Sequence, residues 1–85
     1  MISFPPPAPG TVMHLLYLAS NDKLSERLVS VTSADTTHIK GVDLIKNDFR
    51  CFLCDRLFWA MPVTSQDEQD TLYYLLCVRH YFNAP

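Results

Sequence analysis

Glycine is scarce in this chain, because Gly10 and Gly41 are the only two among 85 residues. A loop that cradles a phosphate needs several glycines close together, so P-loop and dinucleotide-binding folds are excluded. Long apolar runs are also missing, since none approaches the ~20 residues that a membrane-spanning helix needs. No lysine or arginine precedes an apolar stretch at the N-terminus, so we expect no secretory signal and an intracellular protein, cytoplasmic or nuclear.

Excess positive charge is absent as well. Seven Lys and Arg against nine Asp and Glu give a formal charge of −2, whereas nucleic-acid-binding domains are usually basic. Segment 40–56 is the most basic stretch, but its four cations alternate with three aspartates. Binding through phosphates needs several uncompensated cations, so nucleic-acid recognition by this segment is an alternative and not the main prediction.

Motifs of the common hydrolases are missing. The chain has neither G-x-S-x-G nor H-E-x-x-H, and no His-x-Glu of the zinc deaminases. Cys77 and His80 could form a nucleophile pair, but the sequence supplies no evident third group to orient them. We therefore predict that the protein is not an enzyme.

The composition that remains is that of one ordinary globular domain, with 48% hydrophobic and 19% charged residues. A core this small barely offsets the entropy of ordering the chain, so such domains often depend on a disulfide, a metal or a partner. Four prolines fall within residues 1–10, which predicts a flexible arm ahead of a single domain at 11–85.

The cysteines suggest that the stabilising element is a metal. Their pattern is C-x2-C-x22-C-x2-H, and it uses every cysteine of the chain. Three thiolates and one imidazole complete a tetrahedral Zn²⁺ shell with no open position, which is typical of a structural site. The predicted zinc ligands are Cys51, Cys54, Cys77 and His80.

Residues 51–80 resemble the broad class of zinc-knuckle, zinc-ribbon and treble-clef domains in this ligand spacing. His38 or His14 could replace His80 as the fourth ligand. Two other interpretations stay open: the cysteines could be small buried hydrophobes, or Cys51 and Cys54 could form a thiol redox pair.

The N-terminal half favours short strands. Two apolar stretches, 11–19 and 24–32, flank a polar turn at 20–23, which indicates a hairpin or, alternatively, two short helices. A second turn is expected at 33–35, and the β-branched stretch 36–45 should include a strand. We interpret 49–63 as a further hairpin that holds the first zinc pair and ends at Pro62.

The last element has the clearest boundary. Ser65 and Glu68 form an S-x-x-E capping box, which predicts a helix over about 66–82. Cys77 and His80 are then three residues apart on one helix face. The predicted fold is α+β: N-terminal strands and hairpins, a C-x2-C knuckle hairpin and a C-terminal helix, stabilised by zinc.

That helix is apolar nearly all round, although a small domain needs only one apolar stripe to pack it. The excess suggests a second buried surface, either a homodimer interface or a protein partner, or else central placement under the N-terminal hairpin. The residues expected to face a partner are Tyr74, Val78, Tyr81 and Phe82. We therefore expect a zinc-binding adaptor or regulatory protein that acts through protein–protein interaction, with a nucleic-acid-binding regulator and a thiol redox protein as alternatives.

Overall fold

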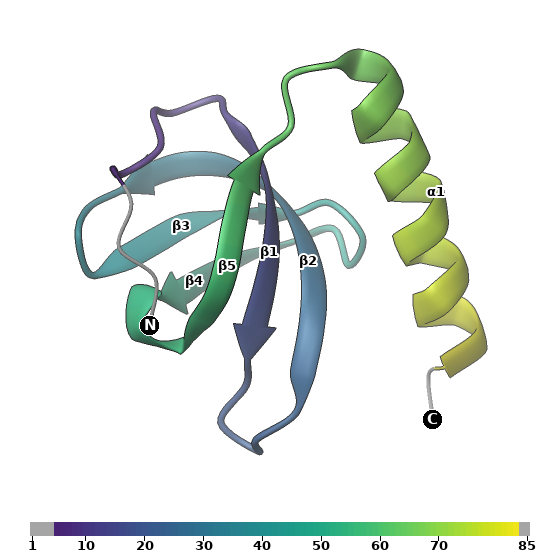
Figure 1. Ribbon diagram of the computed structural model, residues 1–85, viewed down its shortest axis with the longest axis horizontal. Helices are drawn as coiled ribbons and strands as arrows, with labels where there is room; N and C mark the ends of the chain where they lie inside the picture. Colours follow the sequence, from purple (N-terminus) through teal and green to yellow (C-terminus); the bar gives the residue numbers. More distant parts are fainter. Residues whose placement is uncertain (1–4, 84–85) are drawn as a thin grey trace.

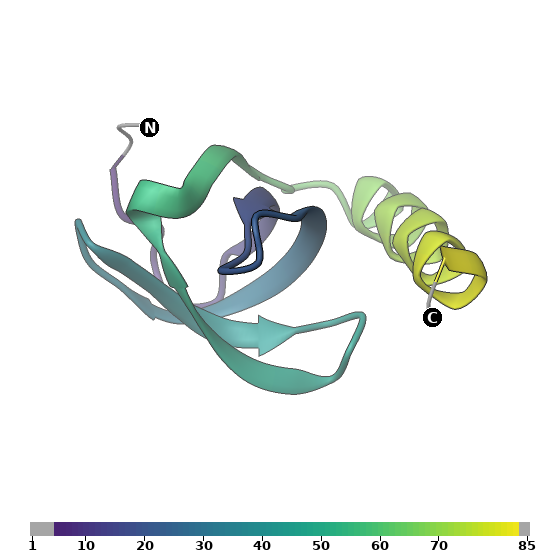
Figure 2. The same ribbon diagram turned by 90° about the horizontal axis from the view of Figure 1, so that it is seen from below.

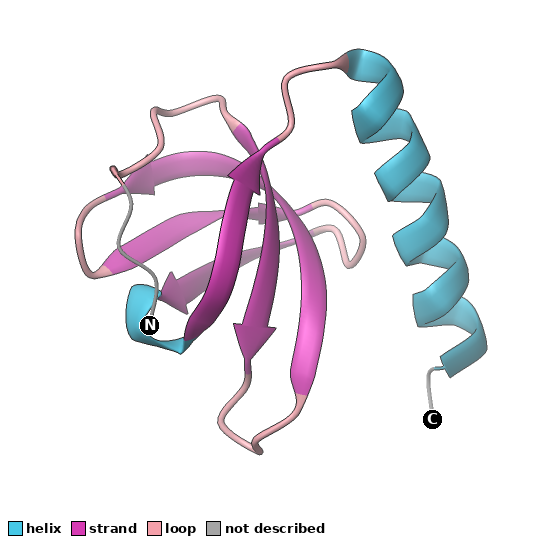
Figure 3. Cartoon of the chain, viewed as in Figure 1, coloured by secondary structure: helices cyan, strands magenta, loops and turns pink. Residues whose placement is uncertain are grey.

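The protein is a curved antiparallel sheet with one long helix beside it. The structure, a computed structural model, describes residues 5–83 (Figure 1). In chain order the elements are β1 (Val12–Leu18), β2 (Leu24–Ala34), β3 (His38–Asp43), β4 (Asp48–Leu53), the short 3-10 helix η1 (Cys54–Arg56), β5 (Leu57–Pro62) and α1 (Gln66–Asn83). The predicted α+β class and the C-terminal helix are thus confirmed (Figure 3).

Strands β1 to β4 form a meander, and β5 then crosses back to pair with β1. The order across the sheet is β4-β3-β2-β1-β5, with every neighbouring pair antiparallel. The predicted N-terminal hairpin is confirmed, since β1 and β2 pair in register from Val12 opposite Ser30 to Leu18 opposite Leu24. Its turn is closed by the Ala19 amide, which donates to the Lys23 carbonyl, and Asp22 adopts the left-handed conformation there.

The predicted knuckle hairpin at 49–63 is wrong. Segments β4 and β5 exist, but they lie at opposite ends of the strand order and pair with β3 and β1. The reason is η1, which turns the chain away from β4 instead of folding it back. Arg56 in η1 donates to the carbonyls of Leu18 and Ala19 at 2.7 and 2.8 Å, and these bonds direct the start of β5 to β1.

The sheet curves strongly (Figure 2), and its main core is one cluster of buried side chains. Side chains point alternately to the two faces of a strand, so each strand contributes its inward positions. Completely or almost completely buried members come from five strands: Leu15, Val29, Ile39, Phe52 and Leu57. The short alternating apolar stretches of the sequence therefore form half-buried strands, as expected for one sheet that covers its own core.

Gly41 permits a close approach of two strands. A β-carbon at this position would lie 2.2 Å from the carbonyl oxygen of Ser30 on β2. The β2–β3 register shifts between Val31 and Ser33, directly beside this contact. Any larger residue would push the two strands apart at this irregularity.

Helix α1 begins where the capping box places it. The Ser65 hydroxyl accepts a hydrogen bond from the Glu68 amide at 3.4 Å, and the helix runs to Asn83. A second small core attaches the helix to the sheet, formed by Leu28, Val63 and Leu76. Among the described residues, no helix is long and apolar enough to cross a membrane.

The structure describes only part of the predicted arm at 1–10. Residues 1–4 lie outside the described range. Pro5–Gly10 forms neither strand nor helix, but the Gly10 amide donates to the Val31 carbonyl at 2.8 Å. The end of the arm is therefore tied to β2.

Candidate functional site

The first predicted zinc pair lies at the end of β4. Cys51 is exposed on this strand, and Cys54 is buried in η1 with 7% of its surface accessible. Only two residues separate them, and the 3-10 turn of η1 begins at Cys54. A C-x2-C pair at a tight turn is thus present.

The second predicted pair lies elsewhere. Cys77 and His80 are on α1, and Figures 1 and 2 place α1 and η1 on opposite sides of the molecule. Within residues 5–83 the structure contains no group of three or more His, Cys, Asp or Glu side chains that could hold a metal ion. The fold as described does not bring the four side chains together, and the zinc site stays a prediction.

The two alternative histidines have other contacts. The His14 Nε2 lies 3.0 Å from Glu26 on β2, and its ring meets the Trp59 ring edge-on at 4.6 Å. His38 contacts the Thr37 hydroxyl through Nδ1 at 2.8 Å. His14 is thus part of the sheet's own packing, and His38 is bound to the β2–β3 turn.

The environment of Cys54 bears on the redox alternative. Burial raises the pKa of its thiol, and the negative charges of Asp35 and Asp55 raise the pKa further. A redox or nucleophilic cysteine needs a lowered pKa, since the thiolate is the reactive form. The surroundings of Cys54 therefore keep it a protonated thiol, which is unfavourable for that chemistry.

Helix α1 is held by one narrow face. Leu76 is 4% exposed and packs with Leu28 and Val63, and Leu72 borders the same cluster. Arg79 pairs with Glu26, and the Gln69 side chain donates to the Val63 carbonyl at 3.0 Å. A cavity of about 400 Å³ remains between α1 and β2, so the helix covers little of the sheet.

The opposite face of α1 carries an exposed aromatic stripe. At about 100° per residue, Tyr74 and Tyr81 lie roughly 160° and 140° from Leu76 around the helix axis. Their exposed fractions are 68% and 82%, and half-buried Val78 lies between them. We call Tyr74, Val78 and Tyr81 the outer stripe; the side chain of the fourth predicted partner residue, Phe82, lies outside the described part.

Charge is distributed unevenly along the same face. Asp67 and Asp70 precede Tyr74 by seven and four residues, so they continue the outer stripe toward the helix N-terminus. Arg79 instead turns to the sheet side, where it pairs with Glu26. The outward face of α1 is therefore acidic at its beginning and apolar toward its end.

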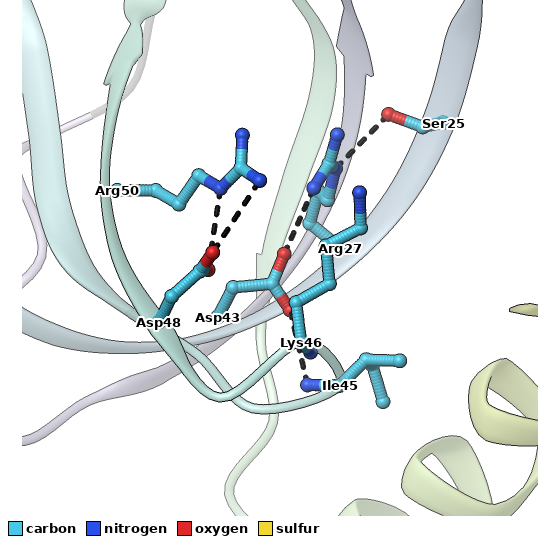
Figure 4. Close-up of polar contacts among 7 residues, drawn as sticks. All are labelled: Ser25, Arg27, Asp43, Ile45, Lys46, Asp48 and Arg50. Carbon is cyan, nitrogen blue, oxygen red and sulfur yellow. Dashed lines mark hydrogen bonds and ion pairs between the residues drawn. The ribbon is translucent and has the colours of Figure 1, made fainter.

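Sequence reasoning missed a polar network between β2 and the β3–β4 turn. Asp43 is 1% exposed and accepts a hydrogen bond from Arg27 Nη1 at 2.9 Å (Figure 4). Its other oxygen accepts the amides of Ile45 and Lys46 at 3.0 and 3.2 Å. Arg27 and Asp43 are sixteen residues apart, and no motif spacing marks such a pair, so a single sequence offers no signal for it.

Comparison with known proteins gives no relative. No family model, curated protein or solved structure matches this chain.

Proposed function

We propose that this chain is a non-enzymatic adaptor that binds a protein partner through the outer stripe of α1. The observation that carries the proposal is the exposure of Tyr74 and Tyr81 on the helix face opposite Leu76. Tyrosine is enriched among residues that dominate binding energy, because it buries a large apolar area and orders few torsions. An amphipathic helix that docks in an apolar groove uses anchors with this spacing.

The charges of the helix indicate the kind of partner. Asp67 and Asp70 extend the stripe, and the helix N-terminus tolerates them because of its positive dipole. A complementary groove is apolar where it meets the tyrosines and carries lysine or arginine at the end that receives these aspartates. We therefore infer a partner protein with an apolar groove and a basic rim.

A second copy of the chain fits these charges poorly. Parallel pairing of two α1 helices would place aspartate against aspartate. Antiparallel pairing would place them near the partner's C-terminal turn, where Arg79 already binds Glu26 on the sheet side. A heterologous partner is thus favoured over a homodimer.

The test compares matched variants. The full chain, the double variant Tyr74→Ser with Tyr81→Ser, and the control Tyr73→Ser are used to capture proteins, and a captured partner is then purified. Tyr73 is on the same helix but nearer the Leu76 side, and it is 48% exposed. With purified components, the double variant should weaken binding about 100-fold or more, and the control less than about 5-fold.

Three outcomes would overturn the proposal. One is that Tyr73→Ser weakens binding as much as the double variant. Another is concentration-dependent dimerisation of the chain alone, seen by analytical ultracentrifugation and abolished in the double variant, because the stripe would then be a homodimer interface. The third is capture of the same proteins by the unmodified chain and by both variants.

A further inference from the structure

A cavity of about 390 Å³ lies between the β1–β2 turn and the end of β4, and three arginines line it. They come from separate elements: Arg27 from β2, Arg50 from β4 and Arg56 from η1. No aspartate or glutamate is among the described residues that line the cavity. Its volume is in the range of small-molecule sites.

Each arginine is fixed through two of its three nitrogens. Arg27 uses Nε for the Ser25 hydroxyl and Nη1 for Asp43, and Arg50 uses Nε and Nη2 for Asp48. Arg56 uses Nε and Nη2 for the two carbonyls at the end of β1. The third nitrogen of each has no partner among residues 5–83, so each guanidinium group keeps a donor to spare. Arg27 and Arg56 are held more firmly than Arg50, whose bonds to Asp48 are 3.2 and 3.5 Å long and lie at an exposed position.

Two of these spare donors point the same way. In Figure 4 the nitrogens of Arg27 and Arg50 that carry no dashed line lie on one side, away from Asp43 and Asp48. The carboxylates stand behind the guanidinium groups and orient them. Such pre-organised donors bind an anion with little further loss of side-chain entropy.

The remaining wall is aromatic and apolar. The Tyr17 and Phe52 rings meet edge to face with centroids 5.0 Å apart, and Leu53 also borders the cavity. The Tyr17 hydroxyl accepts the Leu53 amide at 3.4 Å, which leaves its own proton available to a ligand. An anion bound here would therefore have an apolar surface beside it.

We propose that this cavity binds a small organic oxyanion, a phosphate or carboxylate group attached to a compact aromatic or aliphatic body. Arg27, Arg50 and Arg56 would donate to the oxyanion, while Tyr17 would contact the body. The aspartates behind the arginines keep the local net charge small. Directional hydrogen bonds to one anionic group therefore fit this site better than the long-range attraction on which a polyanion depends.

The experiment is an NMR titration of the ¹⁵N-labelled full chain with phenyl phosphate, benzoate and inorganic phosphate in separate arms. We expect saturable shifts of the arginine side-chain and η1 amide signals, with a dissociation constant below about 1 mM for phenyl phosphate or benzoate. The tighter of these two identifies the oxyanion. Inorganic phosphate should bind at least about 5-fold more weakly than phenyl phosphate, because it lacks the apolar body.

The variants are Arg50→Gln and the charge-matched control Lys40→Gln. Arg50 lies on the edge strand β4 with 40% of its side chain exposed, so its loss should leave the amide spectrum otherwise unchanged. Lys40 is exposed on β3 and does not line this cavity. Arg50→Gln should weaken binding about 10-fold or more and Lys40→Gln less than about 2-fold.

Two results would overturn the proposal: no saturable shift with any of the three probes, or equal weakening by the two variants. Equal affinity for inorganic phosphate and phenyl phosphate would refute the role given to Tyr17. None of these results concerns the outer stripe of α1, so the anion site and the proposed function are tested independently of each other.

Discussion

Replacing Asp43 by alanine removes a carboxylate that three donors share. In the wild type, Arg27 and the amides of Ile45 and Lys46 all donate to this side chain, which is 1% exposed. The variant leaves the Arg27 guanidinium, whose side chain is 12% exposed, without its anion. It also leaves two turn amides without their acceptor, close to the start of β4.

The loss of stability can be estimated from the burial of the Arg27–Asp43 ion pair. Removing one partner of a buried ion pair typically costs about 3–5 kcal/mol, because the other charge stays buried and uncompensated. A chain of this length has a total stability of roughly 4–13 kcal/mol. Since one kcal/mol corresponds to about 4–8 °C in a domain of this size, Asp43→Ala should lower the melting temperature by at least about 12 °C.

Asp48→Ala provides the control in the same region. Asp48 binds Arg50 at 3.2 Å, but the two side chains are 50% and 40% exposed, so the expected cost is about 0–1 kcal/mol. Asp43→Asn keeps an acceptor for the turn amides and should fall between the two. Urea unfolding followed by circular dichroism measures all three. A loss below about 1 kcal/mol for Asp43→Ala, equal to that of Asp48→Ala, would refute the reasoning.

Four further predictions concern other parts of the molecule. Leu76→Ala should lower the free energy of unfolding by about 2–5 kcal/mol and detach α1 from the sheet. Hydrogen exchange should then become faster for the helix amides than for the sheet amides, and equal acceleration of both would contradict the prediction. Gly41→Ala should lower stability by about 1–3 kcal/mol in urea unfolding, because its β-carbon meets the Ser30 carbonyl, and an unchanged midpoint would refute the close approach. Hydrogen bonds from the Thr37 amide and hydroxyl and from the His38 amide lower the pKa of Asp35 to about 2. The stability that Asp35 contributes is therefore present above the ordinary carboxyl pKa near 4 and is lost as the pH falls toward 2. A carboxyl NMR titration should give a midpoint of about 2, and an ordinary midpoint would show that these hydrogen bonds do not form. Native mass spectrometry of protein purified without chelator tests the zinc prediction, which a folded, metal-free chain would refute.

Local signals in the sequence predict local structure here. The capping box at Ser65 locates the start of α1, and the polar turn at 20–23 locates the β1–β2 hairpin. Both depend on contacts between residues close in sequence, which composition and spacing describe directly.

The pairing of strands that are distant in the sequence could not be predicted from such local signals. The sequence of 57–62 does not indicate whether this strand pairs with β1 or with β4, because either pairing would bury the same alternate residues. The decision depends on the bonds from Arg56 to the far end of β1, more than thirty residues away. The zinc prediction has the same weakness, since ligand spacing carries no information about the sides of the molecule on which Cys54 and His80 lie.

The return of β5 to β1 has a consequence for synthesis on the ribosome. Strands β1 to β4 can assemble as each leaves the exit tunnel, but one edge of β1 stays open until Pro62 has emerged. An open edge can pair with strands of other nascent chains. The open edge of β1 therefore persists until β5 leaves the tunnel, after every other strand of the sheet has emerged.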